Sequence, residues 1–161
     1  MEMIDLIKPE QVVSLRAGNK AQLLQELSRR AAKALGLEVQ AILDPLTARE
    51  ALGSTGVGQG VAVPHAKVPG LHRFFALFAR LDKPLNFDAV DGQPVDLVLL
   101  LLIPADADSD HLAALACVAR RLRDPEVARQ LRANADPAAL YELLCGSGQA
   151  PKPGMAAAAK A

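Results

Sequence analysis

Aromatic residues are scarce in this sequence, and tryptophan is absent. Aromatic residues make up 3% of the 161 residues, whereas apolar residues make up 51%. A chain of this length and composition can bury a normal core without the help of metals or disulfides. We therefore expect one domain with a mostly aliphatic interior.

The chain also lacks a charge excess of either sign and has few cysteines. Its 18 basic residues balance 18 acidic ones, which argues against electrostatic binding of nucleic acid or anionic membrane. The two cysteines, Cys117 and Cys145, do not have the spacing of a metal site. We expect both to be reduced, buried thiols outside any disulfide framework.

Long hydrophobic runs and targeting signals are missing as well. The longest apolar run, Val95 to Pro104, contains Asp96 and is far shorter than the ~20 residues that a membrane-spanning helix needs. The first five residues show no basic region followed by an apolar one, as a signal peptide would. We expect a cytoplasmic protein without membrane insertion.

The hydrophobic pattern predicts helices first, strands in the middle and helices last. Strands are expected at 11–15, 61–63, 74–81 and 95–103, and helices at about 20–35, 38–52, 110–122, 125–131 and 136–144. This order indicates an α/β domain with a mixed central β-sheet flanked by helices. The domain is expected to span 1–145, followed by a flexible tail rich in Gly, Pro and Ala at 146–161.

Three residues should shape the first two helices. Asn19 is expected to cap the first helix and Gly36 to end it. Pro45 interrupts the second helix and should kink or restart it.

A glycine-rich segment, GSTGVGQG at 53–60, follows the second helix. Four glycines in eight positions predict a tight irregular loop. The segment fits neither a Walker A loop nor a dinucleotide-binding fingerprint. Its bare amides and the hydroxyls of Ser54 and Thr55 could line a site for a small anion, or the glycines could simply allow a tight turn.

His65 follows an apolar strand and Pro64. Because proline has a fixed φ and makes the preceding residue extended, we expect the imidazole at a defined place near the end of the strand, where ligand sites are common. The three histidines lack metal-type spacing, and no nucleophile elbow is present. Nucleophilic catalysis by His65 itself remains possible, as does an ordinary packed or surface role.

Two further residues are candidates on residue type and position. Arg49, just before the glycine segment, is either a solvated helix residue or a guanidinium that reaches a phosphoryl group. His111, at the expected start of a helix, is either a partly buried helix residue or a donor that lines the site.

Several segments together resemble a known family. Residues 48–65 (AREALGSTGVGQGVAVPH), 86–96 (NFDAVDGQPVD), 102–105 and 111–112 are similar to the type-2 enzyme IIA domain of the bacterial phosphotransferase system. The resemblance covers nearly the whole chain before the tail. The GQPVD and PAD segments are most similar to the nitrogen-regulatory branch, whereas the fructose and mannitol branches share the fold and the histidine.

The resemblance implies roles for the candidate residues. It implies that His65 takes a phosphoryl group on Nε2 from an HPr-like phosphocarrier protein, that Arg49 steadies this group and that His111 lies in the same pocket. Ser54 and Thr55 match the motif and are the candidate phosphate-binding residues. The resemblance implies neither a metal nor a nucleotide cofactor.

The resemblance also implies a regulatory function. In this branch the phosphorylation state governs partner binding, with sensor kinases and potassium transport proteins as possible targets. Two alternatives remain open: an enzyme IIA subunit of a fructose- or mannitol-type sugar transporter, and a purely binding regulator with a vestigial site.

Overall fold

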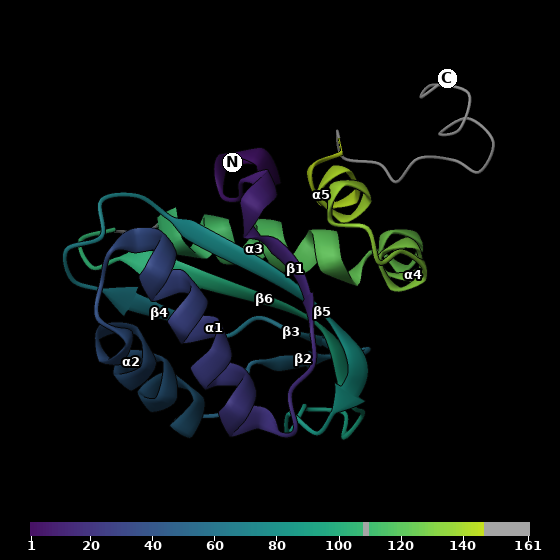
Figure 1. Cartoon of the computed structure of the whole chain (residues 1–161), viewed down its shortest axis with the longest axis horizontal. Coiled ribbons are helices and arrows are strands. Elements are labelled where there is room, and N and C mark those ends of the chain that lie inside the picture. The colour runs from purple at the N-terminus through teal and green to yellow at the C-terminus, as the bar shows by residue number, and fades with distance from the viewer. Residues whose placement is uncertain (108–109, 147–161) are drawn as a thin grey trace.

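A mixed β-sheet runs through the middle of the molecule, with helices on both faces (Figure 1). The computed structural model describes residues 1–107 and 110–146. The strands are β1 (Val12–Leu15), β2 (Gly56–Gly58), β3 (Val61–Ala62), β4 (His65–Val68), β5 (Phe75–Leu85) and β6 (Val95–Pro104). The helices are α1 (Lys20–Leu35), α2 (Val39–Ala51), α3 (Asp110–Arg123), α4 (Pro125–Ala133) and α5 (Pro137–Cys145), and two short 3-10 turns, η1 (Met3–Asp5) and η2 (Pro9–Gln11), precede β1. The predicted α/β fold is confirmed.

Strand β6 is the centre of the sheet. It pairs antiparallel with β5 on one side and parallel with both β3 and β4 on the other. Its side chains alternate between the two faces. Leu97, Leu99 and Leu101 pack with α3, α4 and α5, whereas Val98, Leu100 and Leu102 pack with α1 and α2. Because both faces are covered, the strand reads as a nearly continuous apolar run.

The strand predicted to end before His65 does end, at Ala62, but a second strand, β4, begins at His65 itself. Strands β3 and β4 follow β6 in one register, with Val61 opposite Leu97 and His65 opposite Leu101. Pro64 separates them because it has no amide hydrogen to donate. Its carbonyl still accepts a hydrogen bond from the Leu101 N–H at 2.9 Å, so the pairing resumes at once.

Part of the glycine segment is regular, which corrects the prediction of a loop throughout 53–60. Gly56–Gly58 forms β2, which pairs antiparallel with β3 across a register shift. Gln59 and Gly60 make the turn between these strands with φ values of 60° and 78°. Glycine therefore serves here to build a narrow, irregular hairpin.

Helix α2 runs through Pro45 as one element, so of the kink or restart predicted there the restart is wrong, and the kink stays a prediction. The missing N–H of Pro45 would have bonded the carbonyl of Ala41. Ala41 is exposed, so water can satisfy that carbonyl. The predicted ends of α1 are confirmed: the Asn19 side chain accepts from the Gln22 N–H, and Gly36 is left-handed.

The remaining predictions concern β5, the last three helices, the cysteines, the tail and membrane insertion. The strand predicted at 74–81 continues to Leu85 as β5, and the last three helices form where expected. Cys117 and Cys145 are free and half-buried. Apart from Gly146, the predicted tail lies outside the described residues and stays a prediction. Among the helices that the structure describes, none has both the length and the apolar character needed to cross a membrane.

The turn between β2 and β3 is held from two sides. The Asp91 carboxylate accepts the Gln59 N–H at 2.9 Å. Arg132 on α4 pairs with Asp96 through Nε at 2.9–3.0 Å and donates from Nη2 to the Gln59 carbonyl at 2.8 Å. The guanidinium crosses so close to the backbone that a Cβ on Gly60 would lie 2.4 Å from Nη2.

We expect Gly60→Ala to lower the free energy of unfolding by about 2–3 kcal/mol, because it adds a clash with Arg132 to a left-handed backbone. Gly70→Ala is the matched control, since Gly70 has a similar φ of +85° but nothing within 4 Å of its Cβ position. The control should lose only about 1–2 kcal/mol. Urea denaturation measures both, and equal losses would contradict the role of the Arg132 contact.

Candidate functional site

The His65 ring is held in one orientation by its own chain. Nδ1 lies 2.8 Å from the carbonyl oxygen of Val63. Because a carbonyl oxygen only accepts, Nδ1 carries the hydrogen of this bond. In the neutral ring, Nε2 then has the free lone pair and is the nucleophilic nitrogen.

The surroundings favour the neutral ring. The pKa of His65 is below its usual value of 6.5, mainly because the half-buried ring loses hydration. The hydrogen bond to Val63 opposes this effect by stabilising the charged ring. The charges of Arg49 and His111 lower the pKa further, and the charge of Glu50 raises it. All three groups therefore lie within electrostatic reach of the ring.

Arg49 reaches this region from the last turn of α2. One of its nitrogens, Nη1, donates to the carbonyl of Gly53 at 2.9 Å. This bond fixes the guanidinium beside the start of the glycine segment and uses one of its five N–H donors.

His111 approaches from the other layer of the molecule. It is half-buried in the first turn of α3. In register with Leu101, His65 belongs to the sheet face that packs on α3 to α5. Arg49 and His111 both influence the His65 ring through their charges. That the three residues form one site stays a prediction.

The hydroxyls of Ser54 and Thr55 both have protein partners. Ser54 Oγ donates to the Phe87 carbonyl at 2.9 Å and accepts from the Gly56 N–H at 3.0 Å. Thr55 Oγ1 makes a short hydrogen bond to a carboxylate oxygen of Glu50. These bonds attach the glycine segment to the 86–91 loop on one side and to α2 on the other.

The sequence reasoning missed Glu50 and Lys20. The side chain of Glu50 is only 5% exposed, and Lys20 pairs with it at 2.9 Å while lying over the Phe87 ring. Lys20 is the first residue of α1, and Glu50 lies in the last turn of α2. Each charge is at the unfavourable end of its helix dipole. That placement is the one sequence signal that could have suggested a compensating partner.

Three exposed apolar residues flank the site segments. Leu52, Val90 and Leu112 are 84%, 75% and 62% exposed. Leu52 precedes Gly53, the acceptor of Arg49, and Leu112 follows His111. The Val90 N–H donates to the Gly56 carbonyl at 3.1 Å, so Val90 borders the glycine segment. Each of these exposed apolar residues thus lies in, or hydrogen-bonds to, a segment that carries a candidate site residue.

The described residues include side chains that are possible metal ligands. Within residues 1–107 and 110–146, no group of three or more His, Cys, Asp or Glu side chains is placed to hold a metal ion.

Comparisons with known proteins place the chain in a family. Residues 5–146 match the family described as "Phosphoenolpyruvate-dependent sugar phosphotransferase system, EIIA 2". A nitrogen regulatory protein of Bradyrhizobium diazoefficiens is 50% identical over 145 residues, which cover 89% of this chain and 95% of that protein. Another, from Escherichia coli (strain K12), is 42% identical over 127 residues, 78% of each chain.

A solved structure supports the same assignment. The crystal structure of nitrogen regulatory protein IIA-Ntr from Neisseria meningitidis superposes with a TM-score of 0.81 at 31% identity, covering 86% of this chain and 96% of that one. The chain therefore belongs to the EIIA type 2 family of the phosphotransferase system, a family of phosphoryl-carrying components, and within it is a homologue of the nitrogen regulatory proteins.

Proposed function

We propose that Nε2 of His65 accepts a phosphoryl group from an HPr-like phosphocarrier protein, and that the resulting phosphorylation state regulates partner binding. The observation that carries the proposal is the 2.8 Å contact between Nδ1 and the Val63 carbonyl. It favours the tautomer whose Nε2 lone pair can attack phosphorus.

The transfer balances without a cofactor. Nε2 of His65 forms a bond to phosphorus as the bond from phosphorus to the donor imidazole breaks, and the electron pair of that bond leaves with the donor. The His65 ring gains positive charge in this step because Nδ1 keeps its hydrogen. The Val63 carbonyl accepts the hydrogen bond from this N–H and so stabilises the charge.

Arg49 supplies positive charge, and Arg49 and His111 both supply N–H donors for the phosphoryl oxygens. Transfer of a phosphoryl group depends on positioning and charge stabilisation more than on covalent chemistry. A guanidinium can bind two phosphoryl oxygens at once. His111 acts from the first turn of α3, where the helix N-terminus adds its own partial positive charge.

Phosphate binding by Ser54 and Thr55 stays a prediction. Both hydroxyl hydrogens point at other oxygens, those of Phe87 and Glu50. Direct contact with the phosphoryl group would require each hydroxyl to turn away from its present acceptor.

The regulatory part of the proposal draws on the relatives and on the surface. The relatives with the identities given above are named nitrogen regulatory proteins. A phosphoryl group on His65 would add negative charge beside the exposed apolar residues Leu52, Val90 and Leu112, where a partner can sense it. Sensor kinases and potassium transport proteins are the proposed targets, and the cytoplasm is the proposed location.

We expect His65→Ala to abolish phosphorylation by phosphoenolpyruvate and the donor proteins. His72→Ala, which changes an exposed histidine outside the site, should label like the wild-type protein. Radiolabel that is lost in acid and kept in base measures phosphohistidine. Undiminished labelling of His65→Ala would refute the proposal, and a failure of the wild-type protein to label would favour the vestigial alternative.

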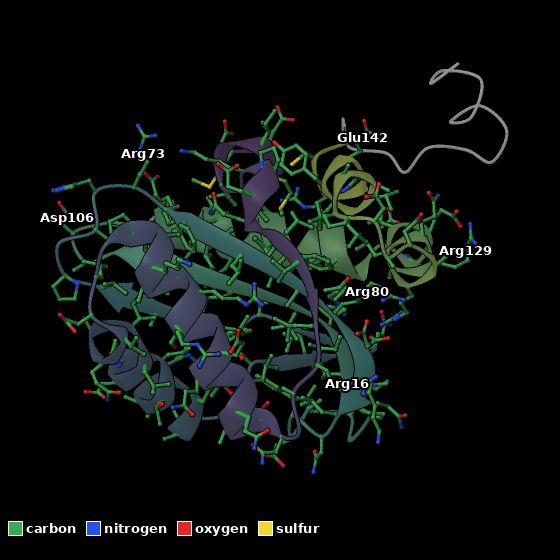
Figure 2. All side chains as sticks on the ribbon, viewed as in Figure 1. Arg16, Arg73, Arg80, Asp106, Arg129 and Glu142 are labelled. Carbon is green, nitrogen blue, oxygen red and sulfur yellow. The ribbon has the colours of Figure 1, made fainter. Side chains whose placement is uncertain are left out.

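We expect Arg49→Ala to slow phosphorylation of His65 by about 10²-fold, because it removes charge and donors from the transition state. Arg129→Ala is the control. Arg129 lies on α4 with its side chain pointing outward, on the opposite side of the view from β4 (Figure 2). Rapid-quench labelling measures both rates. Equal rates for the two variants would exclude a role for Arg49 in the transfer.

The rate of phosphorylation should fall at acid pH, because only the neutral His65 ring has a nucleophilic nitrogen. Since burial lowers the pKa of His65 below 6.5, the rate should be level above about pH 6.5 and decline below it. NMR titration of the ring locates the midpoint without any donor protein. A midpoint at or above 6.5 would show that the ring is more hydrated than its burial indicates.

A further inference from the structure

A series of hydrogen bonds leads from the ion pair between Lys20 and the buried carboxylate of Glu50 to the His65 ring. Oε1 of Glu50 accepts from Lys20 Nζ at 2.9 Å and from the Thr55 N–H at 3.2 Å, and Oε2 accepts from the Thr55 hydroxyl. The Thr55 carbonyl accepts the Val63 N–H at 3.0 Å. The Val63 carbonyl then accepts from Nδ1 of His65.

We propose that Glu50 is a positioning residue for His65, acting through Thr55 and the backbone of Val63 to hold the imidazole in the tautomer that presents Nε2. This inference rests on the proposed phosphorylation of His65 for its functional meaning. The hydrogen bonds themselves do not depend on it.

Because the Glu50 carboxylate is buried, its hydrogen bonds to Lys20 and Thr55 are costly to break. A carboxylate as buried as that of Glu50 must keep its partners, because an unpaired charge would be strongly destabilised. Lys20 supplies the opposite charge, and Thr55 supplies two hydrogen bonds to the carboxylate. Thr55 is therefore fixed at both its amide and its side chain, and so is the carbonyl that holds Val63.

The tautomer matters because only one of the two neutral forms can react. If the Val63 carbonyl moves away from Nδ1, the hydrogen can lie on Nε2 instead, and the Nε2 lone pair is lost. A change at Glu50 should therefore reduce the fraction of molecules ready for transfer. The donor would still bind, because Glu50 is buried away from the protein surface.

Glu50 also acts on the ring through its charge. The carboxylate raises the pKa of His65 and so opposes Arg49 and His111, which lower it. Loss of this charge should shift the titration of His65 further toward acid pH. A role confined to packing would not produce this shift.

The test compares Glu50→Gln, Thr55→Val and Thr55→Ser by ¹H–¹⁵N NMR of the unphosphorylated His65 ring. We expect the wild-type protein and Thr55→Ser to show the Nδ1–H tautomer, and Glu50→Gln and Thr55→Val to show a mixture. Glu50→Gln should also lower the pKa of the ring. With saturating donor, both mixed variants should be phosphorylated about tenfold more slowly, at an unchanged half-saturating donor concentration.

Glu26→Gln is the matched control, because Glu26 makes ion pairs with Arg29 and Arg30 on the surface of α1. It should leave the tautomer, the pKa and the rate unchanged. A wild-type tautomer in both folded variants would overturn the inference, and Thr55→Val alone decides if Glu50→Gln fails to fold. Failure of the proposed function would appear separately, as a wild-type protein that keeps its tautomer but accepts no phosphoryl group.

Discussion

The absence of an amide hydrogen at Pro64 governs the place of the imidazole. A single gap in the ladder divides the strand beside β6 into β3 and β4 without changing its register. The residue after the gap, His65, therefore keeps its register opposite Leu101 of β6. The carbonyl just before the gap, that of Val63, accepts a hydrogen bond from the ring instead of completing a regular pattern. The pairing with β6 thus fixes the backbone at His65, and the Val63 carbonyl directs the side chain.

The glycine segment gains its order from outside itself. Glycines alone would leave this stretch with many conformations, because they restrict the backbone so little. Ser54 attaches one part to the Phe87 carbonyl, Thr55 attaches the next to Glu50, and Arg132 holds the turn that follows. A segment of small residues can therefore approach a ligand closely and still keep one geometry, which is the condition for preorganised stabilisation of charge.

Most of the architecture could be predicted from local patterns. The apolar run of β6, the cap at Asn19 and the prolines at the starts of α4 and α5 act within a few residues of themselves, and their elements formed where expected. The departures from prediction at β2, at Pro45 and at the strand that begins at His65 share a cause. In each case a residue that usually ends regular structure was accommodated by a neighbour or by solvent that the linear pattern does not reveal.

Candidate residues were predictable to the extent that their own chemistry singles them out. An imidazole after Pro64 and an arginine before a glycine segment attract attention in any sequence. Glu50 does not, because its importance depends on Lys20, which is distant in the sequence and comes from another helix. That distance in the sequence has a consequence for local unfolding of the protein. If the first turn of α1 frays, Lys20 leaves and the buried carboxylate loses its counter-charge, so a brief local unfolding at one helix end would disturb the imidazole in another part of the chain.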